Sequence, residues 1–363
     1  MKTAYDAIVL GGGMAGLCVA RELTKRGRSV LLLERETKGG GTSRAAAGIL
    51  DPYTEADQDT PLLRLGTAAL DFYPGFLQEL GTGTAEKVEY EKLGVLYLAF
   101  TEEDERFLKR RFEWQKGRGI PVAWLSPEEV RAREPGVSPR TRSGVFYSEV
   151  PKLNADKLTE AVWKAVEKSG VEIVSSTAEV SVWTEGDRVR GVRFSGGEIE
   201  SPVVVQARGT GEEKVRPVRG QILILRTRPG LEPRHVLHTV RYAYMVPWPR
   251  HQVLVGSTLE RDVTEKKVTA EGQEDILTRA GEIFEKVREL PVETSWAGLR
   301  PQALRELPLI GPTQTRGLFV ATGYYRSGIL IAPLAGKFLA EAILTKKISP
   351  LIEPFDPEKG GLS

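Results

Sequence analysis

The feature that most constrains the fold is a glycine-rich turn close to the start of the chain. The apolar run at 6–10 is typical of a parallel strand buried on both faces, and it leads directly into Gly-Gly-Gly-Met-Ala-Gly at 11–16. Apolar residues at helical spacing follow over 14–25, and a second buried strand is predicted over 29–34. A strand, a glycine turn, a helix and a strand in this order predict the βαβ unit of a dinucleotide-binding domain.

Each glycine of this turn has a separate physical task. Gly11 allows the tight turn, Gly13 lets the backbone approach a pyrophosphate, and Gly16 permits close packing of the helix on the strand. The first N–H groups of the helix, including those of Met14 and Ala15, have no partners within the helix and can bind phosphate oxygens.

An acidic residue at the end of the second strand supports the same interpretation. Glu34 lies eighteen positions after Gly16, where a carboxylate can accept hydrogen bonds from the ribose hydroxyls of adenosine. The alternative is a structural glycine turn beside a surface glutamate. The flanking strands and helix favour dinucleotide binding.

Length and composition limit the remaining possibilities. A chain of 363 residues is long for one ordinary core, so two connected domains are expected. With 51 basic against 49 acidic side chains and a formal net charge of +2, no polyanionic partner such as nucleic acid is predicted. Cys18 is the sole cysteine, which excludes an intramolecular disulfide and a cysteine metal cage and favours a reducing compartment such as the cytoplasm.

Neither a membrane segment nor a metal site is predicted. The start of the chain lacks a secretory signal, and no run approaches the roughly 18 uninterrupted apolar residues that a membrane span needs. The three histidines, His235, His238 and His251, have no spacing with nearby acids that makes a convincing metal site. Solvated strand or loop positions are expected for all three.

The rest of the chain mixes both kinds of secondary structure. Helices are predicted at 60–80, 102–116, 155–168, 271–289 and about 331–344, and strands at 94–100, 171–174, 203–205, 222–225, 253–255 and 318–321. The predicted fold class is mixed α/β, a Rossmann-like domain joined to a second domain built on an antiparallel sheet. We assign residues 1–84, 147–214 and 298–363 to the first domain and residues 85–146 and 215–297 to the second.

NAD and FAD share the glycine turn, and a second segment of small residues decides between them. Residues 39–50 read Gly-Gly-Gly-Thr-Ser-Arg-Ala-Ala-Ala-Gly-Ile-Leu. Small residues let the backbone run close to a flat ring, Thr42 and Ser43 can donate hydrogen bonds to phosphate, and the apolar end can lie under an isoalloxazine. A flexible loop is the alternative. This segment resembles the flavin loop of glycine oxidases in the D-amino-acid oxidase family.

The C-terminal part resembles the same family. Trp-Ala-Gly-Leu-Arg-Pro at 296–301, Leu-Pro-Leu-Ile-Gly at 307–311 and Ala-Thr-Gly-Tyr-Tyr-Arg-Ser-Gly-Ile-Leu-Ile-Ala-Pro at 321–333 are similar to its signature in order and spacing. The resemblance implies non-covalently bound FAD. It also implies cofactor contacts at further residues, namely Arg35, Arg44, Ala46, Ala47, Gly48, Ile49, Glu179, Val180, Gly209, Gly298, Ser327, Gly328, Ile329 and Leu330.

The resemblance assigns three residues to the substrate. Arg300 has the position of the family arginine that pairs with the substrate carboxylate, and a guanidinium fork suits bidentate carboxylate binding. Tyr244 matches a tyrosine whose hydroxyl touches the same carboxylate, and Arg326 matches an arginine beside the flavin and substrate. An interface arginine, a core tyrosine and a helix cap are the respective alternatives.

Several positions depart from the family pattern. Tyr242 stands where one glycine oxidase sequence type has a histidine, and Ile49 and Leu259 stand where it has methionines. These three positions bear on pocket size and substrate choice. The segment Gln-Ala-Arg-Gly-Thr at 206–210 departs on the adenosine side and keeps Gly209 in register.

The resemblance to this family implies an FAD-dependent oxidase of glycine, sarcosine and small D-amino acids. Hydride would pass from Cα to flavin N5, O2 would be reduced to H2O2, and the family role would be to supply iminoglycine for the thiazole of thiamine. A homo-oligomer is expected. The alternatives are a D-amino-acid dehydrogenase with a quinone or carrier acceptor, and a flavin-binding subunit without turnover.

The composition also predicts a heat-stable protein of thermophilic origin. Asn154 is the only asparagine, cysteine and methionine are scarce, and charged residues make up 28% of the chain. We expect a thermal unfolding midpoint above about 70 °C, beyond the roughly 45–65 °C of ordinary mesophile domains. Scanning calorimetry measures this midpoint, and a value within the mesophile range would contradict the expectation.

Overall fold

The first 34 residues fold as predicted. In the computed structural model, which describes residues 2–37, 41–177, 179–194, 197–229, 231–241 and 243–359, the chain forms β1 (Ala7–Leu10), α1 (Met14–Lys25) and β2 (Val30–Leu33) in succession. Both strands are fully buried and pair in parallel. Of the positions singled out above, Gly39, Gly40 and Tyr242 lie outside the described residues.

The first sheet has six strands in the order β17-β18-β10-β1-β2-β6. All neighbours are parallel except the edge strand β17. Besides β1 and β2 its members are β6 (Glu172–Val174), β10 (Val204–Gln206), β17 (Leu309–Pro312) and β18 (Leu318–Thr322). The return of the chain to this sheet near residue 204 confirms the predicted strand there.

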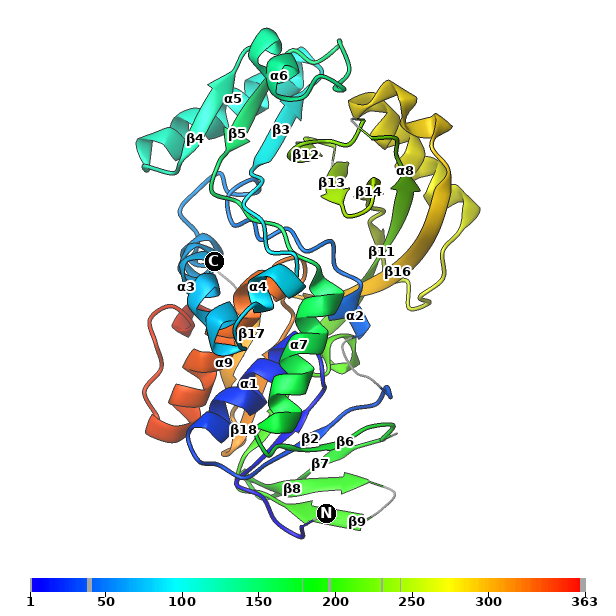
Figure 1. Ribbon diagram of the computed structural model, residues 1–363. Helices are drawn as coiled ribbons and strands as arrows, with labels where there is room; N and C mark the ends of the chain where they lie inside the picture. Colours follow the sequence, from blue (N-terminus) through cyan, green and yellow to red (C-terminus); the bar gives the residue numbers. More distant parts are fainter. Residues whose placement is uncertain are drawn as a thin grey trace.

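Each face of this sheet is covered by different elements, which is why its strands are apolar throughout. Val9 and Leu32 pack in one cluster with α1, α3 (Pro61–Glu79), α7 (Ala155–Lys168) and α9 (Gly328–Thr345). Ile8 and Leu31 point to the other face, against a small sheet of β7 (Ser181–Glu185), β8 (Arg188–Phe194) and β9 (Gly197–Glu200). Figure 1 shows the helices and the small sheet on opposite sides of β1 and β2.

The second sheet forms the other half of the molecule (Figure 1). Its order is β15-β11-β14-β13-β12-β3-β5-β4, with β16 also paired to β11, and its neighbours are antiparallel except β12 and β3. The strands are β3 (Val95–Ala99), β4 (Val122–Leu125), β5 (Ser143–Tyr147), β11 (Val215–Arg226), β12 (Val236–Thr239), β13 (Tyr244–Trp248), β14 (Gln252–Gly256), β15 (Glu260–Arg261) and β16 (Val292–Ala303). The remaining helices are α2 (Gly41–Arg44), α4 (Thr84–Lys87), α5 (Glu102–Gly117), α6 (Pro127–Arg133) and α8 (Ala270–Ile283).

The two sheets confirm the predicted fold class, a Rossmann-like domain with a second domain on an antiparallel sheet. Their strands lie in the segments that the sequence assigns to each domain, apart from Tyr147 at the end of β5 and the second half of β16. β16 runs through the boundary at residue 298 and joins the two halves. We keep the division at 84, 146, 214 and 297 as a proposal.

Two predicted helix boundaries were wrong. The last helix begins at Gly328 rather than at 331, and the helix expected over 271–289 ends at Ile283, with a 3₁₀ turn at Glu285–Glu289. The earlier start of α9 places Pro333 inside the helix, where proline cannot donate to the carbonyl four residues before it. The Tyr73 hydroxyl donates to that carbonyl, of Ile329, at 2.7 Å instead. A hydrogen bond from α3 thus replaces the one that Pro333 cannot donate.

α9 is also the one helix in the described part of the chain that is long and apolar enough to cross a membrane. Its mean hydropathy is 1.6, but 61% of it is buried inside the protein. It packs between α1 and α3. Core helices of large domains have the same composition, because they are covered on most sides.

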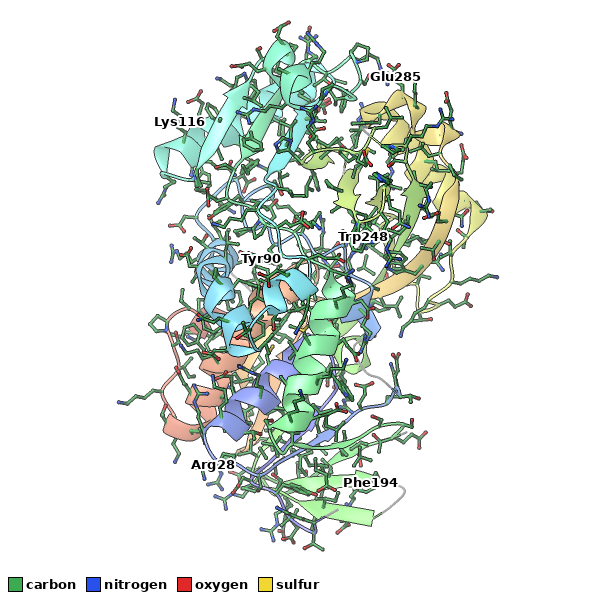
Figure 2. All side chains as sticks on the ribbon, viewed as in Figure 1. Arg28, Tyr90, Lys116, Phe194, Trp248 and Glu285 are labelled. Carbon is green, nitrogen blue, oxygen red and sulfur yellow. The ribbon has the colours of Figure 1, made fainter. Side chains whose placement is uncertain are left out.

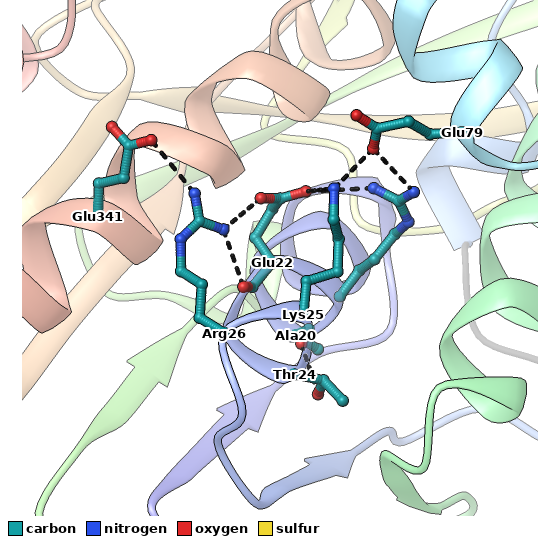
Figure 3. Close-up of polar contacts among 8 residues, drawn as sticks. Ala20, Glu22, Thr24, Lys25, Arg26, Glu79 and Glu341 are labelled. Atoms are coloured by element: carbon teal, nitrogen blue, oxygen red, sulfur yellow. Dashed lines mark hydrogen bonds and ion pairs between the residues drawn. The ribbon is translucent and has the colours of Figure 1, made fainter.

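An ion-pair cluster fastens α1 to two neighbouring helices (Figure 3). Glu22 is buried and pairs with Arg21 at 3.1 Å and with Arg26. Arg21 reaches Glu79 at the end of α3 at 3.1 Å, and Arg26 reaches Glu341 of α9 at 3.2 Å. Networks of this kind are more stabilising at high temperature than isolated pairs, which supports the predicted heat stability.

The largest hydrophobic cluster continues from the helices of the first half into the second sheet. It contains Leu65 of α3 and Leu330 of α9 together with Ile222 and Val246 of the sheet. Tyr90 and Trp248 pack against this cluster and lie where the two halves meet (Figure 2). The halves therefore share one core, which fixes the position of the cavities between them.

Candidate active site

Three adjoining cavities run from the glycine turn to the second sheet. Their volumes are about 380, 150 and 630 Å³. The first and second share Gly11 and Glu34, and the second and third share Thr42 and Arg326. Every predicted site residue except Gly16 and Arg44 lines one of them. An elongated ligand with a nucleotide at one end and a ring at the other fits this arrangement.

The glycine turn leaves space that side chains would fill. Gly11 has a positive φ of 111°, and a Cβ on Gly16 would lie 1.9 Å from the Gly11 carbonyl oxygen. Gly16 thus serves packing, as predicted, rather than lining the cavity. The buried Glu34 carboxylate accepts hydrogen bonds from the N–H of Gly12 and, at 2.7 Å, of Glu36. These bonds hold the carboxylate at the cavity edge, where the ribose hydroxyls are expected.

The cavity beyond Glu34 has the features of an adenosine site. Glu179 and Val180 line it together with Arg35. Arg208, the departure noted above, also lines it and donates to the Val180 carbonyl at 3.0 Å. The side chain therefore supports the wall of this cavity without closing it.

The small-residue loop bonds to both neighbouring elements. The Ser43 hydroxyl accepts from the Met14 N–H at 3.0 Å, and the Thr42 hydroxyl donates to the Leu299 carbonyl at 2.6 Å. The Trp296 indole donates to the Ala45 carbonyl at 3.0 Å. These bonds clamp the loop between α1 and β16, so a ring in the third cavity would meet a fixed backbone.

Arg44 does not occupy the position expected for a cofactor-binding residue. Its guanidinium pairs with Asp156 at 2.5 Å and Glu160 at 2.8 Å, both on α7. Asp156 and Glu160 lie one helical turn apart on α7, and their negative charges draw the Arg44 guanidinium away from the cleft. We assign it the role of anchoring α2 to α7.

Arg300 lies in the wall of the third cavity, on β16. Its Nη2 donates to the Ser257 hydroxyl at 2.6 Å and its Nη1 to the Thr258 carbonyl at 3.2 Å. A Cβ on Gly220, in the facing strand, would lie 2.1 Å from Nη2. Glycine is therefore required at 220 for the guanidinium to lie flat against the sheet.

The register of the second sheet explains why further side chains meet in this cavity. Ile222, Gly256, Tyr244, His238 and Tyr97 form a row across five neighbouring strands. Residues in such a row share one face of a sheet. Ile222, Tyr244 and His238 accordingly line the cavity.

Tyr244 is partly buried, and its hydroxyl lies close to Arg300. A Cβ on Gly256 would lie 2.8 Å from the Tyr244 hydroxyl oxygen, so the glycine makes room for it. Burial raises the pKa of Tyr244, although Arg300 and Ser257 lower it in part. The phenol stays protonated in neutral solution and can donate a hydrogen bond.

Arg326 lines both the second and third cavities, as the resemblance implies. It forms an ion pair with Glu55, and Glu55 lines the third cavity too. The pair joins the turn before α9 to the loop before α3. The sequence did not identify Glu55, because nothing in a loop sequence indicates which residue an acidic side chain will pair with.

Two histidines contradict the expectation of solvated positions. The His235 side chain is 19% exposed, with its Nδ1 2.7 Å from the buried Glu134 carboxylate. His238 is partly buried in the cavity wall, stacks near Tyr244 at 6.3 Å between ring centroids, and has a buried Nδ1 for which the described residues offer no partner. Burial, together with Arg326 and Arg111, lowers the pKa of His238 to about 4. The imidazole is therefore neutral at neutral pH. Its strand position alone could not reveal which face was buried.

The departures Ile49 and Leu259 also lie at this cavity. Leu259 is 40% exposed and stands near the rim. These positions can therefore influence which substrate side chains enter.

Comparison with known proteins decides the family. The pattern of the family described as FAD dependent oxidoreductase (DAO) matches residues 6–342. The chain belongs to the DAO family. FAD is accordingly its cofactor, and the three cavities with their glycine-lined walls fit that molecule.

Individual relatives are similar over the whole chain. The glycine oxidase of Geobacillus kaustophilus (strain HTA426) is 30% identical, covering 98% of this chain and 97% of that protein. The crystal structure of glycine oxidase from Geobacillus kaustophilus matches with a TM-score of 0.92 at 28% identity, over 99% of this chain and 100% of that one. The bifunctional protein ThiO/ThiG of Trichormus variabilis is 28% identical over 96% of this chain, and the match covers 54% of that protein.

Gly220→Ala tests whether the space beside Gly220, here called the slot, positions the Arg300 guanidinium. The new methyl group would displace the guanidinium, and a displacement near 1 Å costs roughly 100-fold in a well-positioned site. We expect the FAD-loaded variant to bind acetate about 100-fold more weakly, measured from the change in the visible flavin spectrum. Gly117→Ala, where a Cβ meets open space, is the control. Equal acetate affinity in both variants would show that the slot does not position Arg300.

Proposed function

We propose that this protein oxidises glycine, and with it sarcosine and small D-amino acids. The observation that carries the proposal is the Arg300 guanidinium beside the Tyr244 hydroxyl in the cavity that the flavin loop also lines. A positive fork and a neutral phenol at one point suit a carboxylate. The glycine oxidases that match over nearly the whole chain support the choice of substrate.

The chain's own residues bind and orient the substrate. Arg300 supplies the charge, and its bonds to Ser257 and Thr258 fix the plane of the guanidinium. Tyr244 donates a second hydrogen bond to the same carboxylate. Holding a small carboxylate at two points orients its Cα–H. Translational and rotational entropy is then lost on binding rather than in the reaction step, which lowers the barrier to the reaction.

FAD held in the three cavities would supply the hydride acceptor, and O2 would be the final oxidant. Glycine with a neutral amine and O2 would give iminoglycine and H2O2, with two electrons and two protons moving from substrate to oxygen. His238 is neutral beside Tyr244 and adds no positive charge to the wall. A substrate with a neutral amine can therefore lie against this wall while Arg300 binds its carboxylate.

The ThiO/ThiG relative supports a role in supplying iminoglycine for thiamine thiazole synthesis. We further propose a cytoplasmic homo-oligomer from a thermophilic source. The competing activity is a D-amino-acid dehydrogenase. Stoichiometric oxygen uptake with glycine, followed with an oxygen electrode, supports the oxidase, whereas turnover only with a quinone acceptor would refute it.

Arg300→Ala should raise the Michaelis constant for glycine by at least about 100-fold, because a charge-assisted pair to the carboxylate is lost. FAD should remain bound, since Arg300 does not line the two cavities that would hold the nucleotide end of the cofactor. Peroxide formation against glycine concentration gives the constant. Arg300→Lys, which keeps the charge without the fork, should recover part of the loss.

Arg226→Ala is the matched control, because Arg226 lies on the same sheet and pairs with Glu293 at the surface. It should leave the Michaelis constant unchanged. Near-normal kinetics in Arg300→Ala would remove the carboxylate site from the proposal.

A further inference from the structure

A lysine of the second half reaches across to the glycine-lined cavity of the first half. Lys266 lies in the loop between β15 and α8 and lines the second cavity with Gly13 and Ser43. Its Nζ is 2.6 Å from Glu36, in the segment after β2. A Cβ built on Gly41 would be 3.3 Å from the same Nζ.

The loop that carries Lys266 is fixed at both ends to β11. Arg219 pairs with Glu260 before the loop, and its guanidinium also donates to the Glu265 carbonyl at 3.4 Å. At the far end the Thr269 N–H donates to the Gln221 side chain at 2.8 Å. Lys266 is thus held at the mouth of the cavity by bonds that do not involve its own charge.

The carboxylates in this part of the cavity are unfavourable for an anionic ligand, so a cation is needed to bind one. Glu34 and Glu36 line the cavity beside the glycine turn, and both would repel a pyrophosphate. Arg35, Arg208 and Arg326 also line this cavity, but Arg35 and Arg208 extend into the first cavity and Arg326 into the third, whereas Lys266 lines the second alone. Arg44, in the same loop as Ser43, is engaged with the acids of α7. Lys266 stands over Gly41, two residues from Ser43, whose hydroxyl is bonded to the first N–H of α1.

The ion pair between Lys266 and Glu36 is weak enough for Lys266 to exchange Glu36 for another anion. Their side chains are 41% and 40% exposed, and pairs this open contribute between about 0 and 1 kcal/mol. A pyrophosphate diester, which carries two negative charges over its two phosphates, is a stronger partner for an ammonium in a partly enclosed cavity.

We propose that Lys266 binds the pyrophosphate of FAD, leaving Glu36 when the cofactor enters, and so lets the substrate-binding half hold the cofactor of the other half. Family membership supplies the identity of the cofactor, and the proposal does not depend on glycine being the substrate. Lys266 is a cofactor-binding residue here and takes no part in hydride transfer.

The test compares three ligands of the stripped protein. FAD carries both the ring and the pyrophosphate, ADP carries the pyrophosphate without the ring, and riboflavin carries the ring without phosphate. Dissociation constants come from FAD fluorescence, with ADP measured by competition. Lys266→Met should weaken FAD and ADP binding about tenfold each and leave riboflavin unchanged.

Two further variants separate this role from a simple bridge between domains. Lys267→Met, at the exposed neighbouring residue, should bind all three ligands like the unmodified protein. Glu36→Gln removes the bridge but frees Lys266, so it should bind FAD at least as tightly as before. Circular dichroism melting of each stripped variant shows that it is folded.

Three results would overturn the proposal. One is unchanged FAD affinity in Lys266→Met, the second is an equal loss for riboflavin, and the third is an equal loss in Glu36→Gln. The last two would mark Lys266 as a structural bridge. None of these outcomes depends on turnover, so a protein that binds FAD as predicted but fails to oxidise glycine would refute the proposed function alone.

Discussion

The site depends on a charged guanidinium held flat against the inner face of a sheet. Arg300 is satisfied by one hydroxyl and one carbonyl from consecutive residues, Ser257 and Thr258. A charge in a partly buried wall is costly unless it is hydrogen-bonded. These bonds to neutral oxygen atoms stabilise the charge, and they leave the guanidinium able to bind a carboxylate.

The same strand connects this charge to the cofactor cleft. β16 carries Trp296 and Leu299, which bond to Ala45 and Thr42 of the flavin loop, and Arg300 follows directly. A shift of the loop would therefore move the strand that positions the guanidinium. The two halves are not independent bodies with a site between them, since one continuous strand sets the spacing of ring and carboxylate.

Much of this arrangement could be predicted from sequence because its signals are local. The turn at Gly11, the helix over residues 14–25 and the acid at Glu34 follow one another within a single βαβ unit. Arg300 and Tyr244 were found through their motifs, and both line the same cavity.

What could not be predicted depends on contacts between distant segments. Gly220 appears in sequence as an ordinary glycine in a strand, and only the register with β16 shows that it makes room for Arg300. His238 was placed in solvent because one residue of register decides which face of a strand is buried. Arg44 was expected at the cofactor, but the fold sets Asp156 and Glu160 beside it.

A crystal structure of the FAD-loaded protein with acetate tests the central claim most directly. The account predicts the acetate carboxylate within hydrogen-bond distance of the Arg300 guanidinium and the Tyr244 hydroxyl, on the side of the isoalloxazine that faces the second sheet. Acetate bound elsewhere, or an isoalloxazine outside the third cavity, would contradict it.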